Sequence, residues 1–461
     1  MKFYLAILLF PAVLSAQTVE APYAQYLATV TLSAHPELKK MGIHAVPPGK
    51  TDSQIIGSNV PTKLGKKSSA PDMAVVKANQ PHAGTKEGVF DLAFPLNDKS
   101  GQPIGLMVME IFSTQVKDEP DALAKGAAIR DEVSRQIPTS ARLFGPAPAT
   151  APLVLLSSTP LPDITGDFDH FAVDLEHDRL WVSAEVHHSI ELFKLKTGEH
   201  VRSYPGVTTP HTIAYEPQTN RLLVADGGDG SCRILDGDDL HQIATVPLDP
   251  GPDAGFYDGE HHIFYIGNGG RTAKADFSYI TAVNADNAKV ERKIRVEANN
   301  LEAMAMEPVA KLLYVNMRDK SSVGVIDLEK GEVKQTWPVT GLQGNTPLSL
   351  DADHRRLFIA GRKPGKFLVL DTSTGKTVAA LNTIETADDM TFDPAAKRIY
   401  VTGAGGVTVI EQQSADQYRT LAQFATNSGK TSVYVPQLHQ FYIIHTKTAE
   451  DGAALQVYKV Q

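Results

Sequence analysis

Short apolar runs recur along the last two thirds of the chain, and small residues follow most of them. The runs are rich in β-branched and aromatic residues, which is typical of buried strands. They are RLWV ending at Val182, RLLV at Val224, IFYI at Ile266, LLYV at Val315, RLFI at Ile359, RIYV at Val401 and QFYI at Ile443. Successive end residues are 42, 42, 49, 44, 42 and 42 positions apart. A regular period of this length predicts a repeat architecture.

Each repeat contains four stretches with strand character. An alternating stretch such as HTIAYEP (211–217) comes first, then the apolar run, then a third stretch such as SCRILDG and a weaker fourth. Four antiparallel strands in one period make one blade of a β-propeller. Seven units fill residues 163–461, and the last stops after its third strand. We expect LVLLSSTPL (153–161) to close the ring by pairing with LQVYKV (455–460), because an open strand edge is a liability.

The third repeat is longer than most of the others. Its extra residues lie in NGGRTAKADFSY (268–279), between the second and third strands. The insertion should therefore project as a loop from one face of the ring. Loops on a rigid scaffold often carry function, although a plain surface insertion fits the sequence equally well.

Residues 20–145 lack this period and show an α+β pattern. The stretches FDLAFPL and IGLMVMEIF flank the turn NDKSGQP and predict a strand pair. A helix is expected over 118–137, with Asp118 as its cap, Pro120 in its first turn and Pro138 after its end. The Pro/Ala-rich stretch GPAPATAP (145–152) reads as a linker across which two domains fold independently. The predicted fold class is mainly β: a seven-bladed β-propeller (153–461) preceded by a small α+β domain (20–145).

The first residues and the charge bear on location and partners. MKFYLAILLFPAVLSAQ combines one lysine, an apolar run and small residues, so residues 1–16 are expected to be a secretory signal. The run is too short for a membrane span and no later run is long enough, so we expect a periplasmic or secreted protein. A net charge of −9 without a Lys/Arg block argues against nucleic-acid binding. Cys232 is the only cysteine, which leaves no intrachain disulfide.

The phrase RIYVTG within a ring of repeats resembles the YVTN-repeat β-propeller family and the wider seven-bladed group that includes lactonase-like propellers. The resemblance covers roughly residues 153–461 and implies the fold, whereas such propellers serve binding, scaffolding and several catalytic chemistries. In the N-terminal half, GIHAVPPGKTDSQIIGSN, LGKKS and PLNDKSGQPIG resemble an extracytoplasmic sensor domain of the PAS/Cache type.

Polar residues occupy the start of the innermost strand in every repeat. With the repeats aligned, these positions are Asp169, His211, Asp253, Glu302, Thr346, Asp388 and Lys430, and His170 and Asp389 stand beside two of them. Ring symmetry would place them around one mouth of the central channel. The candidate ligand-binding residues are therefore Asp169, His170, His211, Asp253, Glu302, Asp388, Asp389 and Lys430.

This ring of residues allows several roles. Converging carboxylates can bind Ca²⁺ or another divalent cation through oxygen, hold a polar ligand, or shift one another's pKa for acid–base chemistry. The same residues could instead satisfy backbone groups of neighbouring blades. A looser set follows the apolar runs, namely Asp226, Asn268, Asn316 and Arg362, and Asp226 lies in DGGDG (226–230), which predicts a tight turn.

Two classes of function follow from the sequence. One is an exported binding or scaffold protein that uses the propeller face to recognise a small molecule or a protein. The other is a lactonase- or hydrolase-like enzyme with a divalent cation in an acidic mouth. No catalytic residue is assigned, because HExxH, CxxCH and GxSxG are all absent.

Overall fold

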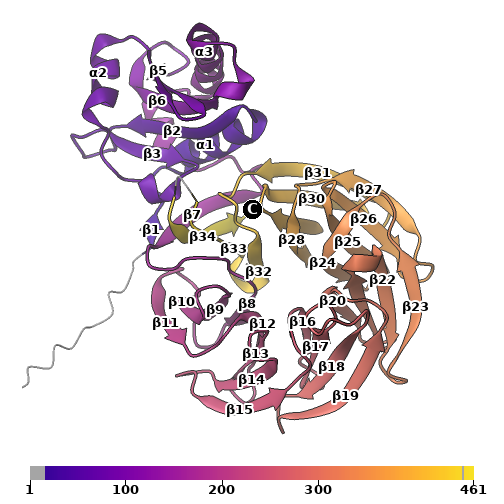
Figure 1. The fold of residues 1–461 in the computed structure, drawn as a ribbon. Helices are drawn as coiled ribbons and strands as arrows, with labels where there is room; N and C mark the ends of the chain where they lie inside the picture. Colours follow the sequence, from indigo (N-terminus) through magenta and orange to yellow (C-terminus); the bar gives the residue numbers. More distant parts are fainter. Residues whose placement is uncertain (1–15, 449–450) are drawn as a thin grey trace, which may run out of the picture.

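The computed structural model describes residues 16–448 and 451–461. The predicted signal segment, residues 1–16, lies outside the described residues except for Ala16. A ring of β-sheets forms the larger part of the molecule, and a smaller α+β part lies at one side of the ring (Figure 1). The predicted mainly-β class, a propeller preceded by a small α+β domain, is confirmed.

Six four-stranded antiparallel sheets follow one another in chain order within the described residues. The first contains β8 (Phe171–Asp174), β9 (Arg179–Ala184), β10 (Ser189–Lys194) and β11 (His200–Pro205). The second contains β12 (Pro210–Glu216), β13 (Arg221–Asp226), β14 (Ser231–Asp236) and β15 (Gln242–Pro247). The third contains β16 (Gly255–Asp258), β17 (Ile263–Gly269), β18 (Ser278–Asn284) and β19 (Lys289–Val296).

The remaining three sheets repeat the same order of strands. The fourth contains β20 (Leu301–Glu307), β21 (Leu312–Met317), β22 (Ser322–Asp327) and β23 (Glu332–Pro338). The fifth contains β24 (Gln343–Asp351), β25 (Arg356–Lys363), β26 (Lys366–Asp371) and β27 (Thr377–Asn382). The sixth contains β28 (Ala387–Asp393), β29 (Arg398–Gly403), β30 (Gly406–Ser414) and β31 (Gln417–Phe424).

A seventh sheet closes the ring by joining the two ends of the repeat region. It contains β32 (Thr431–Val435), β33 (Gln440–His445), β34 (Ala453–Val460) and β7 (Leu153–Leu161). As expected, β34 pairs antiparallel with β7, with Val460 opposite Leu153 and Ala453 opposite Leu161. The innermost strands of neighbouring sheets contact one another around the ring, and β32 contacts β8. The apolar core lies between adjacent sheets, as where Val182 and Phe193 pack with Tyr442 and Leu455.

The arginine that opens four of the repeated phrases ties its own sheet to the next one. Arg179, Arg221 and Arg356 begin second strands and donate to carbonyl oxygens of the following sheet, at Gly237 (2.5 Å), Ala285 (2.6 Å) and Ala415 (3.1 Å) respectively. Arg398 makes the same contact to the carbonyl of Gln461. The repeat in the sequence therefore records contacts between sheets as well as strands.

The N-terminal part is a five-stranded antiparallel sheet with three helices. The sheet has the order β3-β2-β6-β5-β4. Its elements are α1 (Pro22–Ala34), β2 (Leu38–Ala45), β3 (Gln54–Ser58), α2 (Ala70–Ala78), β4 (His82–Lys86), β5 (Val89–Asn97), β6 (Pro103–Phe112) and α3 (Glu119–Gln136). The Asp118 carboxylate accepts from the N–H of Asp121 (2.9 Å) and caps α3, so the predicted helix and the β5–β6 strand pair are confirmed. No helix in the described part of the chain is long and apolar enough to cross a membrane.

The two parts of the molecule share contacts beyond the predicted linker. β1 (Gln17–Thr18) pairs with Ser157 and Ser158 of β7 and so adds a fifth strand to the closing sheet. Val19 and Leu64 belong to an apolar cluster with Tyr400 and Phe424 of the propeller. Independent folding of the two domains stays a prediction. These shared contacts mean that each domain would have to be stable without them.

Candidate functional site

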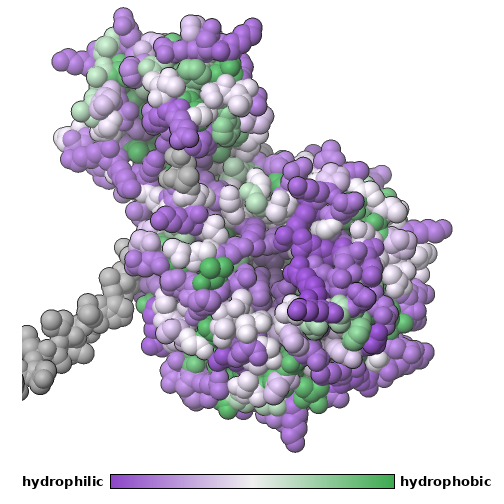
Figure 2. Space-filling view, viewed as in Figure 1, coloured by the Kyte–Doolittle hydropathy of each residue, from purple (hydrophilic) through white to green (hydrophobic). Residues whose placement is uncertain are grey.

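All eight predicted ligand-binding residues line one cavity of about 200 Å³ where the innermost strands begin. Asp169 and His170 precede β8, His211 lies in β12, Asp253 precedes β16, Glu302 lies in β20, Asp388 and Asp389 lie in β28, and Lys430 precedes β32. Thr346 of β24 completes the lining, so every sheet of the ring contributes. We call this cavity the mouth. Hydrophilic residues also surround the centre of the ring on the face shown in Figure 2.

The sequence did not predict four charged residues of the mouth as members of this ring. Glu185 follows β9, Arg318 follows β21, and Arg362 lies in β25. Arg271 belongs to the inserted loop of the third repeat, which therefore does reach the site. All four come from positions at or after the second strand of a repeat. The mouth is consequently mixed in charge, with six carboxylates, four Lys or Arg side chains and two histidines.

One side of the mouth pairs its own charges. Asp388 accepts from Lys430 Nζ (2.7 Å) and pairs with Arg362, and Lys430 lies 3.0 Å from Asp167. Burial opposes the charge on Lys430, but the two carboxylates raise its pKa above the ordinary value. Glu302 accepts from Arg318 (2.9 Å). Here burial, aided by the Asp253 carboxylate, still raises the pKa of Glu302.

The other side is built around two histidines. His211 Nδ1 lies 2.8 Å from Asp169 and 3.6 Å from Asp253. Burial disfavours the charged ring, yet the bond to Asp169 and the charge on Asp253 raise the pKa of His211 to about 9. His170 lies 3.4 Å from Asp169 and 3.6 Å from Asp389. Burial also opposes the charge on Asp169, but His170 and His211 hold its pKa far below the ordinary value.

Three carboxylates in the mouth are poorly compensated. Burial raises the pKa of Glu185 and of Asp253. It raises the pKa of Asp389 to about 6, although His170 and the N–H of Ser432 (2.8 Å) favour its charged form. A cation or a hydrogen-bonding ligand would stabilise these groups in their ionised form.

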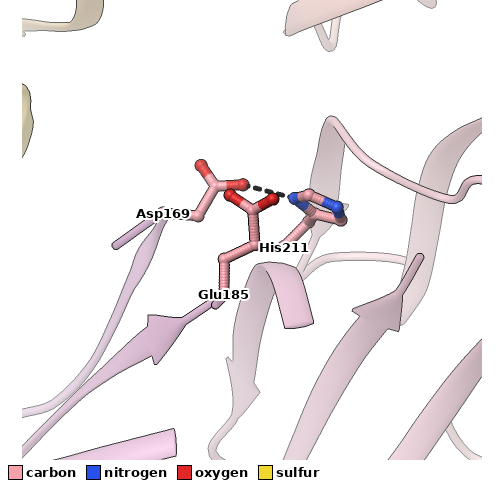
Figure 3. A group of neighbouring side chains, drawn as sticks. All are labelled: Asp169, Glu185 and His211. Carbon is pink, nitrogen blue, oxygen red and sulfur yellow. Dashed lines mark hydrogen bonds and ion pairs between the residues drawn. The ribbon is translucent and has the colours of Figure 1, made fainter. Parts of the chain in front are cut away.

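Asp169, Glu185 and His211 form the group best placed to hold a metal ion. Each offers a donor atom, and these atoms all lie within 4.8 Å of one another. Figure 3 shows the two carboxylates pointing toward the His211 ring, Asp169 from before β8 and Glu185 from the end of β9. Two carboxylates and an imidazole suit a divalent transition metal, whereas Ca²⁺ takes about six to eight oxygen ligands. The donor set therefore fits Zn²⁺ or Mn²⁺ better than the Ca²⁺ expected from a ring of carboxylates.

Of the four residues that follow the apolar runs, two hold the backbone in place and two line cavities. Asp226 is fully buried, accepts from the N–H groups of Thr208 and Thr209 (2.8 Å each) and pairs with Arg233, so it holds a turn as predicted. Asn316 donates to the backbone carbonyls of Thr346 and Pro347 and is structural too. Arg362 lines the mouth, and Asn268 lines a neighbouring cavity.

Comparison with known proteins supports the fold alone. No family model matches the sequence, and no curated protein does. Among solved structures, Kuenenia stuttgartiensis hydrazine synthase aligns with a TM-score of 0.54 at 15% identity, over 63% of this chain and 98% of that chain. A mitotic checkpoint complex aligns with a TM-score of 0.54 at 12% identity, over 66% of this chain and 90% of that chain. Both are similar to this chain as β-propellers.

Proposed function

We propose that this chain is an exported binding protein whose propeller mouth holds a small polar ligand together with a divalent metal ion. The observation that carries the proposal is the lining of the mouth, where charged or polar side chains from every sheet face one cavity and alanine is the only apolar residue type. A closed ring fixes these side chains on a rigid scaffold, which favours selective binding. We place a small ligand before a protein partner because the charges line a cavity rather than a flat surface.

Metal binding supplies the first test. Zn²⁺ or Mn²⁺ added to the metal-free protein should raise the melting temperature, because an ion bound only to the folded state stabilises it. Asp169→Asn and His211→Gln should each abolish the increase. Asp239→Asn is a matched control, since Asp239 belongs to a second Asp–Asp–His group on the surface. The proposal fails if the control loses the increase and the two mouth variants keep it.

A lactonase- or hydrolase-like activity is the second candidate, and the group Asp169–Glu185–His211 favours it. A divalent ion there would polarise a carbonyl or activate water. The neighbouring Asp253 carboxyl, whose pKa burial raises, could give or take a proton there. We also propose that the propeller belongs with the YVTN-repeat group and that the N-terminal part is related to PAS/Cache-type domains.

Product analysis separates the two candidates. The metal-loaded protein is incubated with lactones and esters, and the mixtures are analysed by mass spectrometry. A binding protein returns the added compound unchanged. A hydrolase adds one water per molecule, and Glu185→Gln should slow that reaction without unfolding the protein.

A further inference from the structure

A second cavity, of about 250 Å³, opens beside the mouth. We call it the side cavity. Its lining comes from strands and loops of the second, third and fourth sheets, together with Glu185 of the first, and it shares Glu185, His211, Asp253 and Arg271 with the mouth. Leu301 is the only large apolar residue in its lining. Its volume is below the range of about 300–1,000 Å³ typical of drug-sized ligands, so its occupant must be small.

The side cavity differs from the mouth in what its polar groups do. Within the described ranges 16–448 and 451–461, the hydroxyls of Thr209, Thr272 and Ser278 and the side-chain amides of Asn299 and Asn300 make no hydrogen bond. The inserted loop supplies Thr272, and the segment before β20 supplies the two amides. In the mouth, by contrast, most charged groups pair with one another. The side cavity therefore presents free donors and acceptors.

Asn268 gives an independent sign that a ligand belongs there. Its side chain lies in the cavity wall and the residue is only 3% exposed. Its Nδ2 donates to the carbonyl of Ile266 (2.9 Å) and to Thr281 Oγ1 (2.8 Å). Its Oδ1 is buried and has no partner among the described residues. Buried polar atoms are nearly always hydrogen-bonded, so Asn268 has unused accepting capacity in the wall of the side cavity.

Gly227 lets the His211 ring pack closely against the backbone between the two cavities. A Cβ at Gly227 would lie 2.7 Å from His211 Cδ2, which no side chain could occupy without moving the ring. The imidazole therefore stands directly against backbone, with its edge available to both cavities. The two cavities thus form one continuous binding region.

We propose that the side cavity is a subsite for a polyhydroxylated compound of about monosaccharide size. Sugar hydroxyls both donate and accept, which matches the mixture of free hydroxyls, amides and a buried acceptor. An amino acid with an apolar side chain fits less well, because that side chain would contact only Leu301 among the large apolar residues described in the lining. This inference rests on the proposed function and deepens it, because the two cavities share residues. Of these, Arg271, Glu185 and Asp253 would contact the end of the sugar nearest the metal.

The test measures binding by calorimetry, with and without Zn²⁺, against a neutral hexose, the matching sugar acid, the amino sugar and glycine. The double variant Thr272→Val/Asn299→Leu keeps side-chain size and removes two free polar groups. We expect it to weaken sugar binding at least tenfold while the Zn²⁺-induced rise in melting temperature is retained. Thr336→Val, on the exposed outer strand β23, is the control and should bind as the wild type does.

The outcomes separate the two proposals. Loss of the Zn²⁺ response in Asp169→Asn with sugar binding kept would support the side cavity and localise the metal in the mouth. Arg271→Met should weaken only the sugar acid if a carboxylate faces this guanidinium, and all sugars equally if a hydroxyl does. The subsite is overturned if no sugar binds to the wild type, if glycine alone binds, or if the double variant binds sugars as tightly as the control. Ser278→Ala provides a second variant should the double variant fail to fold.

Discussion

Asp169 and His211 are joined by a 2.8 Å hydrogen bond although they belong to different sheets and stand 42 positions apart. Lys430 and Asp388 are joined across the same separation, at 2.7 Å. Both separations equal the most common period of the apolar runs. The repeat that builds the ring therefore also brings residues from equivalent positions into contact, and the mouth is assembled from such neighbouring pairs.

The pair with Asp169 should make stability depend on pH through His211. Its pKa rises from an ordinary 6.5 to about 9, so the stabilisation is fully present below pH 6.5 and is lost as pH rises through 9. In buffer with a chelator, the free energy of unfolding of wild type should exceed that of His211→Gln by about 3 kcal/mol at pH 6. Denaturant unfolding from pH 6 to 10 measures the difference. A difference that is constant across this range would contradict the raised pKa.

Asp389 should act in the opposite sense. Burial raises its pKa from 3.8 to about 6, so the folded state loses stability as pH rises from about 4 to 6 and bears the full cost of this ionisation above pH 6. Asp389→Asn should therefore stabilise the protein by roughly 2 kcal/mol at pH 7, and the gain should vanish below pH 4. Ser432 N–H can still donate to the amide oxygen. Thermal unfolding at the two pH values is sufficient, and a variant less stable than wild type at pH 7 would refute the prediction.

The same substitution should have opposite effects at two carboxylates of the mouth. Asp388→Asn leaves Arg362 without its carboxylate and Lys430 with only Asp167, and should destabilise by about 3 kcal/mol. The Asp253 carboxylate lies 3.6 Å from its paired cation, His211, and burial raises its pKa. Asp253→Asn should therefore raise the melting temperature in the absence of metal. Calorimetric scans of both variants test this. Shifts of equal sign would mean that charge pairing does not distinguish the two sides of the mouth.

The arginine of the repeated phrase should contribute to the contact between sheets. Arg356 is largely buried and reaches Asp371 (2.8 Å), Asp416 (2.7 Å) and the carbonyl of Ala415. Arg356→Met should cost about 2 kcal/mol, because charged partners lose their hydrogen bonds. Arg355→Met is the control, since this neighbour is exposed. Equal melting temperatures for the two variants would show that the contact contributes nothing.

The sequence located the ring positions well because they share one register. Asp253 and Glu302 begin inner strands in successive repeats, and the period alone aligned them. Glu185, Arg271 and Arg318 lie one or two residues beyond the second strands, in loops of different length, so no common register marks them. Extending the looser set, which stopped at Asn268 and Asn316, by two or three residues would have reached both arginines.

Other features depend on contacts that no local pattern carries. β1 has only two residues, too few to show an alternating pattern, and its pairing with β7 is accompanied by apolar packing of the neighbouring Val19 and of Leu64. The mouth expected from the ring positions also contains Arg271, Arg318 and Arg362, which come from other positions in the repeats, although carboxylates still outnumber the lysine and arginine side chains in its lining. By contrast, the closing pair of β7 and β34 could be predicted, since the last repeat lacked a strand and 153–161 had the right pattern.

The closing pair can be tested within the full chain. Ser158 lies opposite Gln456 on one side and Gln17 on the other, and is fully buried. Ser158→Pro removes a ladder hydrogen bond and should cost about 3 kcal/mol or more, whereas Ser158→Ala should change stability little. Melting temperatures of the two variants decide the matter. If the proline variant melts at the same temperature as wild type, closure by β7 does not stabilise the ring.

The pairing of β7 with β34 also orders events during synthesis. The two strands are separated by almost the whole repeat region, so the ring cannot be completed until β34 has left the ribosome. Until then β7 has an unpaired edge, and contacts of such long sequence separation form slowly. The N-terminal strand β1, already made, occupies the opposite edge of β7 and shields one side during this wait. Growth of the nascent chain is thus followed by a single late step that converts an open array of sheets into a ring.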